Sequence, residues 1–444
     1  MLVKRESSVE SVQVVADAEG LVSRAGTALV AGVADRSGLT AALSEALAGI
    51  RHRRSRHDPG RVVRDLALTL ADGGDCLSDL RCLRDQESLF GEVASDATAW
   101  RAIAALEGTR LEQVRAARAR ARGQVWKQAG LPRRVVLDID GTLVTAHSEK
   151  EGATGTYKGS FGFHPLLCYE AQTGEALAGT LRPGNAGFNT ARDHIELLEQ
   201  ALAQLPEEAI SEGVLVRCDR SGATHAFTEH VAERGLRFSV GLDLTEPVRE
   251  AILALSEEVW GPALTSDGED REGAWVAELS LDLSGWPAGT RAICRRERPH
   301  PGAQLSFTDE HGYRFQVFLT NQQGSRIARL EQLHRQRAVC EDRIRCGKES
   351  GLRNLPFRDF QPNAAWLELV LIAQDLLCWT QRLLLADTEL ARCEPKRLRY
   401  RLLHVAGRLS RHARRLVLHL PRRWPWRSEL LVAFERLRAL PHPP

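Results

Sequence analysis

The sequence predicts a mixed α/β fold preceded by an all-helical N-terminal domain, on the strength of three observations. Residues 1–130 carry apolar residues at helical spacing and hold no good strand run. From Arg134 onward, three strand-like segments follow one another, and strands then alternate with helices. Residues 364–385 form a long apolar segment, which predicts a helix that packs against the sheet.

The N-terminal region, residues 1–130, is expected to be a helical DNA-binding domain. Helix starts are indicated by Asp-Pro-Gly at 58–60 and by Ser-Asp-Ala-Thr at 95–98. The stretch from Thr109 to Lys127 holds six basic residues and one acidic residue. A helix of this charge could lie in a DNA groove, and a solvated face of a helical bundle is the alternative.

The central region, residues 131–257, is expected to form the first part of a catalytic core. Strands are predicted at 135–144, 163–170, 175–181, 214–218 and 236–242, and helices at 190–205, 224–234 and 246–257. Three strands in succession favour an antiparallel meander, and the crossover helices then add parallel strands. This β-β-β-α-β-α-β-α order resembles the ribonuclease-H-like plan, a mixed sheet with helices on both faces.

The remaining chain divides into three predicted parts. Residues 258–323 are rich in turn residues and strand-like runs and are expected to be a β-rich insertion. Residues 324–390 are expected to complete the core with a further helix, and residues 391–444 to form a basic helical tail. From Arg392 to Pro444 there are 14 basic and 3 acidic residues, or +11, whereas the whole chain carries +2. Such a tail favours a polyanionic partner, most commonly nucleic acid.

Composition excludes several classes of protein. A chain of 444 residues with 43% hydrophobic and 27% charged residues is neither disordered, nor a fibre, nor a small disulfide scaffold. Without an apolar run of 18 residues or a signal peptide, it is expected to be cytoplasmic, with no membrane contact. The nine cysteines form no Cys-x-x-Cys pair, which indicates reduced thiols. His164, His225 and His230 show no metal-ligand spacing and are interpreted as structural or exposed.

Two strand positions carry the first candidate site residues. Asp138 and Asp140 alternate with apolar residues, so they lie on one face of the predicted strand. Their mutual repulsion is most simply relieved by a metal ion, and a solvated strand end is the alternative. Asp219 follows the strand at 214–218, which the meander places beside the first strand. Asp140 and Asp219 are therefore expected to meet across about 5 Å.

A helical stripe carries the third candidate carboxylate. His334, Arg337, Glu341 and Lys348 are separated by 3, 4 and 7 residues, which places them on one side of a helix. A carboxylate flanked by cations suits a groove that holds both a metal ion and phosphates. The alternative is an ordinary charged face in contact with solvent.

These residues together resemble the DDE transposases of bacterial insertion sequences, in particular a branch with the signature Tyr-x2-Arg-x3-Glu-x6-Lys. Arg337, Glu341 and Lys348 match that signature, and His334 stands at the tyrosine position. Asp-Gly-Thr at 140–142, Leu-Arg-Pro-Gly-Asn at 181–185 and Ser-Asp-Ala-Thr at 95–98 are also similar to that branch. The resemblance extends over roughly residues 26–440.

The resemblance implies a catalytic site and a reaction. Its metal ligands and catalytic residues are Asp140, Asp219 and Glu341, with Asp138 as a further candidate ligand, for two Mg²⁺ ions that Mn²⁺ can replace. Its phosphate-binding residues are His334, Arg337 and Lys348. Its candidates for holding a flipped base, should excision use a hairpin, are Trp260, Trp275 and Trp286, with core positions as the alternative.

The resemblance also implies the setting of that reaction. A nucleoid-associated bacterial enzyme of this kind binds terminal inverted repeats and target DNA, acts as a homodimer on paired ends, and cuts and reinserts its element.

A competing interpretation starts from the first acidic motif. Asp-Ile-Asp-Gly-Thr-Leu at 138–143 also matches the haloacid-dehalogenase-like phosphatases, in which Asp138 would be the nucleophile. That family also needs a lysine and a later acidic pair at a strand end. After Lys158 only Lys348 and Lys396 remain, and neither follows a predicted strand. The transposase is therefore favoured, and the phosphatase and a catalytically decayed DNA-binding relic are the alternatives.

Overall fold

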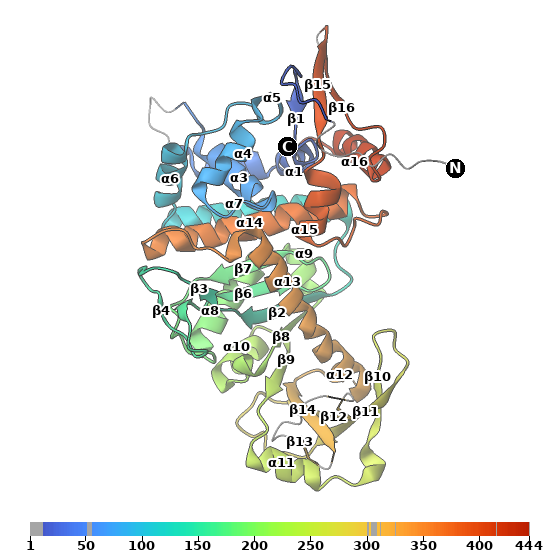
Figure 1. Cartoon of the computed structure of the whole chain (residues 1–444). Coiled ribbons are helices and arrows are strands. Elements are labelled where there is room, and N and C mark those ends of the chain that lie inside the picture. Colours follow the sequence, from blue (N-terminus) through green and yellow to red (C-terminus); the bar gives the residue numbers. More distant parts are fainter. Residues whose placement is uncertain are drawn as a thin grey trace, which may run out of the picture.

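A ten-stranded mixed sheet organises the part of the chain that the structure describes (Figure 1). The structure is a computed structural model and describes residues 12–50, 56–299, 302, 309–310, 312–324, 326–413 and 415–443. The strand order is β10-β11-β12-β14-β9-β8-β2-β6-β7, and β13 pairs with β14. The strands are β2 (Val135–Gly141), β6 (Leu166–Glu170), β7 (Ala176–Thr180), β8 (Val214–Cys218), β9 (Arg237–Leu242), β10 (Gly261–Leu264), β11 (Asp270–Leu279), β12 (Arg291–Glu297), β13 (Asp309–Glu310) and β14 (Tyr313–Thr320).

Strand β2 lies in the interior of this sheet. It pairs antiparallel with β6 and parallel with β8, and β8 pairs parallel with β9. Every residue of β6 and β8 is buried, as is β2 from Val135 to Ile139. Strands covered on both faces need near-continuous apolar sequence, which is why these runs could be recognised. Asp138 and Arg217 are exceptions to that apolar pattern.

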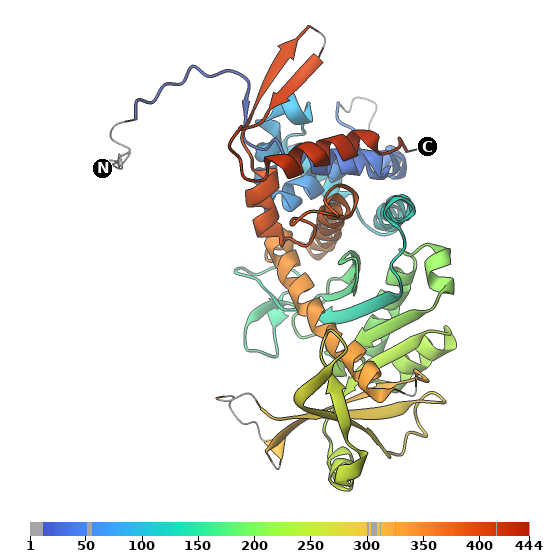
Figure 2. The same cartoon turned by 90° about the vertical axis from the view of Figure 1, so that its right-hand side faces the viewer.

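Helices cover the sheet from two sides. Helices α8 (Ala191–Leu202) and α10 (His225–Glu233) pack on β6, β7 and β9. Helices α12 (Ile327–Arg335) and α13 (Val339–Gly347), joined by a short 3₁₀ turn, run along the sheet from β10 and β11 to β2. Figure 2 shows the two pairs, green and orange, on opposite sides of the sheet. Helices α9 (Glu207–Ser211) and α11 (Glu246–Leu253) are shorter and more peripheral.

A long buried helix, α14 (Phe360–Leu384), joins the sheet to the N-terminal helices. It contacts β7 on one side and α1, α3, α6 and α7 on the other (Figure 1). One apolar core runs from Val22 to Ala433, so the N-terminal helices share their core with the sheet. These helices are α1 (Thr27–Arg36), α2 (Leu39–Ala46), α3 (Pro59–Ala71), α4 (Arg81–Arg84), α5 (Glu87–Phe90), α6 (Asp96–Ala104) and α7 (Thr109–Ala129).

Helix α7 buries two of its six basic residues, and for these two neither a DNA groove nor a solvated bundle face applies. Arg118 and Arg122 are fully buried. Arg118 lies 2.7 Å from both Glu368 and Asp375, and Arg122 lies 2.9 Å from Glu175 and also pairs with Asp375. Buried charges of this kind need close partners of opposite sign, and α14 and the start of β7 provide them. Two of the basic residues therefore stabilise the interior.

The C-terminal segment, expected to be helical, also contains a hairpin. Strands β15 (Gly407–His412) and β16 (Arg415–His419) pair with each other, and β15 pairs with β1 (Leu21–Val22) in the region expected to be all helical. Leu409 is buried between more exposed neighbours, which is the period-two pattern of a strand. Helices α15 (Pro395–Leu398) and α16 (Arg427–Ala439) flank the hairpin.

Two further differences concern the connections within the sheet. A small separate sheet, in the order β3 (Val144–Thr145), β5 (Phe161–Phe163), β4 (Thr154–Gly155), lies between β2 and β6, so these strands are not joined by a short turn. The predicted β-rich insertion extends the main sheet, because β14 pairs with β9.

No helix in the described ranges is both long and apolar enough to cross a membrane.

Candidate active site

Asp138 is buried and neutralised by an arginine from the neighbouring strand. Arg217 Nε and Nη2 donate to the two carboxylate oxygens at 2.7 and 2.8 Å, and Arg217 also donates to the carbonyl of Leu333 at the end of α12. The expected metal site is therefore not needed to explain Asp138, because Arg217 occupies both oxygens. Sequence reasoning missed Arg217. Its signal was an arginine in an otherwise apolar strand, two residues before Asp219.

Asp140 and Asp219 lie at the same edge of the sheet, as expected. The parallel register pairs Ile139 of β2 with Cys218 of β8, so the residue after each of them is one of the two aspartates. Asp140 accepts a hydrogen bond from the backbone of Gly141 at 2.8 Å, and Asp219 accepts one from the backbone of Ser221 at 2.9 Å. Each carboxylate thus accepts a hydrogen bond from the backbone one or two residues further along the chain.

The negative charges around Asp140 are only partly balanced by nearby positive charge. Burial raises the pKa of Asp140 to about 6, the charges of Asp219 and Glu341 raise it too, and Arg337 opposes them. Arg337 Nη1 lies 3.3 Å from Asp140 Oδ2. Burial lowers the pKa of Arg337, but the charges of Asp140 and Asp219 outweigh it and the net shift is upward. Arg337 thus holds a positive charge at the two aspartates.

Glu341 comes to the site from α13, the helix that contacts β2. Its side chain is exposed, and its charge acts on Asp140. In the described part of the chain, however, oxygens of Asp140, Asp219 and Glu341 do not all lie within 4.8 Å of one another. The structure therefore brings the three predicted carboxylates into electrostatic range without closing them into a ligand cage.

His334 differs from the expectation of a phosphate contact. Its ring stacks on Phe318 with centroids 4.3 Å apart, and its Nδ1 lies 2.9 Å from the Ser239 hydroxyl. Burial, together with the charges of Arg337 and Arg217, lowers the pKa of His334 to about 3. The ring is uncharged near neutral pH, so it offers a phosphate no positive charge.

Lys348 directly follows α13, and the charges of other cations act on it. Burial lowers the pKa of Lys348, and the charges of Arg353 and Lys158 lower it further. The carboxylates of Asp140 and Asp219 are not among the groups that shift it. Lys348 therefore belongs to a positive region, as a phosphate contact requires.

His164 lies next to the site. From the sequence, this histidine is interpreted as structural or exposed. It is buried, and its Nδ1 lies 3.3 Å from the carbonyl of Ala186. A Cβ atom on Gly141 would lie only 2.8 Å from His164 Nε2 and 3.8 Å from Arg182 Nη2. Glycine after Asp140 thus leaves room for these two side chains.

The three tryptophans proposed for a flipped base all have partners. Arg296 lies 4.4 Å from the ring centroid of Trp260 and 5.2 Å from that of Trp275. Trp286 packs on His225 with ring centroids 4.3 Å apart. All three side chains are half-buried, so no one of them is singled out by exposure.

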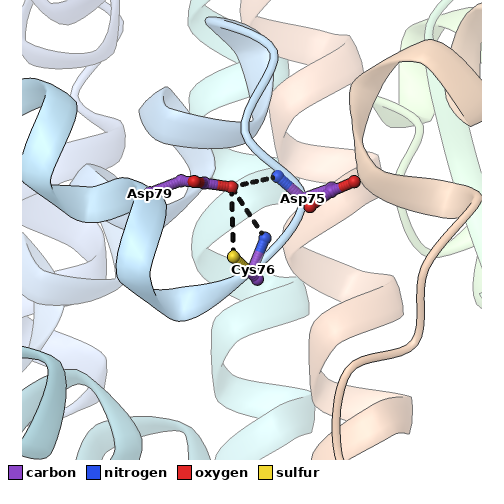
Figure 3. Close-up of side chains that lie close together, drawn as sticks. All are labelled: Asp75, Cys76 and Asp79. Atoms are coloured by element: carbon purple, nitrogen blue, oxygen red, sulfur yellow. Dashed lines mark hydrogen bonds between the residues drawn. The ribbon is translucent and has the colours of Figure 1, made fainter.

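A second group of potential metal ligands lies at the start of the 3₁₀ turn Leu77–Leu80. Asp75, Cys76 and Asp79 have ligand atoms within 4.8 Å of one another. Figure 3 shows that Asp79 accepts hydrogen bonds from the backbone of Asp75 and Cys76 and from the Cys76 thiol. These bonds form the cap of the turn and explain the cluster without a metal ion.

The fold and site define a class of protein: an α/β protein with acidic residues at the ends of adjacent parallel strands and a third carboxylate on a covering helix. The chain belongs to a particular family, Transposase DDE domain group 1, whose family model matches residues 4–442. The expectation of a transposase is thereby confirmed. In the phosphatase alternative Asp138 would be the nucleophile, but both of its carboxylate oxygens accept hydrogen bonds from Arg217.

Among solved structures, the chain resembles a piggyBac transposase in a synaptic complex with hairpin DNA, seen by cryo-electron microscopy. The two share 12% identity with a TM-score of 0.42, over 84% of this chain and 77% of that one. No curated protein matches the chain.

Proposed function

We propose that this transposase belongs to a bacterial insertion sequence, binds its terminal inverted repeats, and performs Mg²⁺-dependent strand cleavage and strand transfer. The observation that supports the proposal is the parallel pairing of β2 with β8, since Asp140 and Asp219 directly follow the last paired residues and Arg337 lies 3.3 Å from Asp140. The strand order β7-β6-β2-β8-β9, with β6 antiparallel and β8 and β9 parallel to β2, supports a ribonuclease-H-like core.

The donor set fits Mg²⁺. Asp140, Asp219 and Glu341 offer hard carboxylate oxygens, and the raised pKa of Asp140 is relieved by a nearby cation. When bound, Mg²⁺ or Mn²⁺ would activate the attacking hydroxyl group and stabilise the charge of the leaving oxygen. Glu341, exposed on α13, is the ligand whose side chain moves to complete the set. Asp138 is left out because Arg217 holds it.

The side chains that surround the carboxylates have separate roles in the proposal. Arg337 pairs with Asp140 in the free protein and turns to a phosphate oxygen when DNA is present. Lys348 holds a neighbouring phosphate, and His334 orients the α12–α13 turn through Phe318 and Ser239. Trp260, Trp275 and Trp286 remain the proposed candidates for holding a flipped base.

The proposed domains and partners extend this assignment. Residues 1–130 and the basic residues 391–444 bind the inverted repeats, with the tail's excess of positive charge as the supporting observation. Residues 131–257 and 324–390 form the catalytic core, with residues 258–323 inserted. Two protein copies bring two ends together, in a cytoplasmic, nucleoid-associated complex. Sizing of the protein bound to an end fragment tests the dimer.

The deciding experiment uses DNA that carries the inverted repeats flanking the gene. Wild-type protein with Mg²⁺ is expected to nick it, and Asp140→Asn is expected to reduce the rate by at least about 10³-fold, with similar losses for Asp219→Asn and Glu341→Gln. Glu229→Gln, an exposed change on α10, is the matched control and is expected to be active. A folded wild-type protein that binds ends but never nicks them would instead indicate a decayed relic.

A further inference from the structure

A hairpin tip near the candidate site presents two exposed side chains that the proposed chemistry does not use. The tip joins β4 to β5, and the Thr156 and Gly159 backbone N–H groups donate to Ser160 and Thr156 carbonyls at 2.7 and 2.9 Å. Gly159 has φ +75°, a conformation that favours glycine. The turn is therefore well defined, and it holds Tyr157, 70% exposed, and Lys158 toward solvent.

The base of this hairpin is fastened to the chain that follows α13. The Glu151 backbone donates to the Arg358 carbonyl at 2.8 Å, and the Phe360 backbone donates to the Glu151 carboxylate at 2.7 Å. The rings of Phe163 and Phe360 have centroids 6.3 Å apart. The hairpin is thus held beside the start of α14 and does not depend on DNA for its position.

The side chain of His164 lies between Tyr157 and the strand end that carries Asp140. Its ring centroid is 5.7 Å from that of His164, and His164 Nε2 in turn lies against Gly141, the residue after Asp140. A DNA strand with a phosphate at Asp140 therefore has a neighbouring nucleotide within reach of the Tyr157 ring. An exposed aromatic face in that position suits stacking on a base.

Positive charge gathers at the same place. The charges of Lys158 and Arg353 both act on Lys348. Among the described residues, no ion pair joins any of these three side chains to a carboxylate, and the Lys158 Nζ lies 5.7 Å from the ring centroid of Tyr157. Like charges brought together without an acidic partner are unfavourable in the free protein, and a polyanion relieves the repulsion.

We propose that Tyr157, Lys158 and Lys348 form a strand-binding platform, in which a nucleotide beside the scissile phosphate stacks on Tyr157 and the two lysines contact flanking phosphates. The proposal rests on the proposed function and adds the β4–β5 hairpin to its DNA contacts. Because every base has an aromatic face, the platform is expected to bind a strand whatever its sequence.

The experiment measures affinity for a fluorescein-labelled oligo(dT) strand by anisotropy, without divalent ions, over a range of salt concentrations. Tyr157→Ala is expected to weaken binding roughly tenfold, and Tyr157→Phe to preserve it, since the ring still stacks. The slope of log K against log salt is negative, and Lys158→Gln is expected to make it less steep by about 0.7, since one phosphate contact is lost. Arg234→Gln, an exposed change at the C-terminal end of α10, is the matched control, with a slope equal to the wild type.

Two failures can be told apart. If the wild type binds and nicks inverted-repeat DNA while Tyr157→Ala binds oligo(dT) as tightly as it does, the platform is refuted and the proposed function stands. If the folded wild type binds no DNA, the proposed function fails and the platform with it. Equal thermal unfolding midpoints for all variants show that any loss of affinity is local.

Discussion

Arg217 binds both carboxylate oxygens of Asp138 across two parallel strands, at 2.7 and 2.8 Å. The pair is buried, with side chains only 2% and 1% exposed. Asp138 and Asp140 share a strand face but have different partners: Arg217 pairs with Asp138, and Arg337 lies 3.3 Å from Asp140. The excess negative charge of the strand ends is therefore concentrated on Asp140 and Asp219.

Asp138→Asn is expected to destabilise the protein by about 3–5 kcal/mol, because it leaves the guanidinium of Arg217 buried without a charged partner. Urea unfolding of the free protein measures this. Asp342→Asn is the matched control, since Asp342 forms an exposed pair with Arg345 and its loss is expected to change stability by less than about 1 kcal/mol. An Asp138→Asn protein of normal stability that no longer binds Mg²⁺ would contradict the structural role.

Asp140→Asn is expected to stabilise the protein at neutral pH without divalent ions. The pKa of Asp140 rises from an ordinary 3.8 to about 6, so ionisation in the folded state opposes folding. The penalty is absent below pH 3.8, grows as pH rises toward 6, and reaches about 1–3 kcal/mol above it. Urea unfolding at pH 4 and pH 8 checks the sign: the two proteins are expected to agree at pH 4 and to differ at pH 8. Glu229→Gln is expected to show no such difference.

Binding of Mg²⁺ is expected to weaken as pH falls below 6, because protons then compete for Asp140. At subsaturating Mg²⁺, nicking is expected to fall by up to about tenfold per pH unit between pH 6 and pH 5. Saturating Mg²⁺ is the control, since it shifts the decline to lower pH. A nicking rate that does not respond to pH at low Mg²⁺ would show that Asp140 does not hold the ion.

Asp375→Asn is expected to destabilise the whole molecule by about 3–5 kcal/mol, because Arg118 and Arg122 both bind Asp375 in a fully buried network. A single, cooperative loss is expected by circular dichroism and by tryptophan fluorescence. Asp387→Asn is the matched control, as its pair with Arg436 is exposed. Unfolding of the N-terminal helices alone, with the sheet intact, would contradict the shared core.

The sheet strands were predictable where burial on both faces leaves an apolar run, as in β8, whose predicted bounds 214–218 match the structure. Strand β12 was missed because its second half is Arg-Arg-Glu. Arg295 is buried there against Glu331, and Arg296 against Glu257 and the ring of Trp260, partners distant in sequence. Such pairing depends on tertiary structure and leaves no periodic signal in the strand itself.

The candidate site was predictable in part for the same reason. Neighbouring strands follow from topology, so the meeting of Asp140 and Asp219 could be expected. Helical spacing placed His334 on the stripe of Arg337 and Glu341, but spacing cannot reveal that Phe318 stacks on its ring. The turn between α12 and α13 also interrupts the stripe, since Gln336–Ala338 is a 3₁₀ segment.

The position of α14 in the chain has a consequence for biosynthesis. Its residues, Phe360–Leu384, supply Glu368 and Asp375 to arginines of α7 and cover β7, yet the ribosome makes them after four-fifths of the polypeptide. Until they emerge, Arg118 lacks both of its acidic partners and Arg122 lacks one of two, and the nascent N-terminal helices lack their central support. Acquisition of the native state is thus a late, nearly post-translational event, and fragments that stop before Phe360 are expected to be degraded or to aggregate.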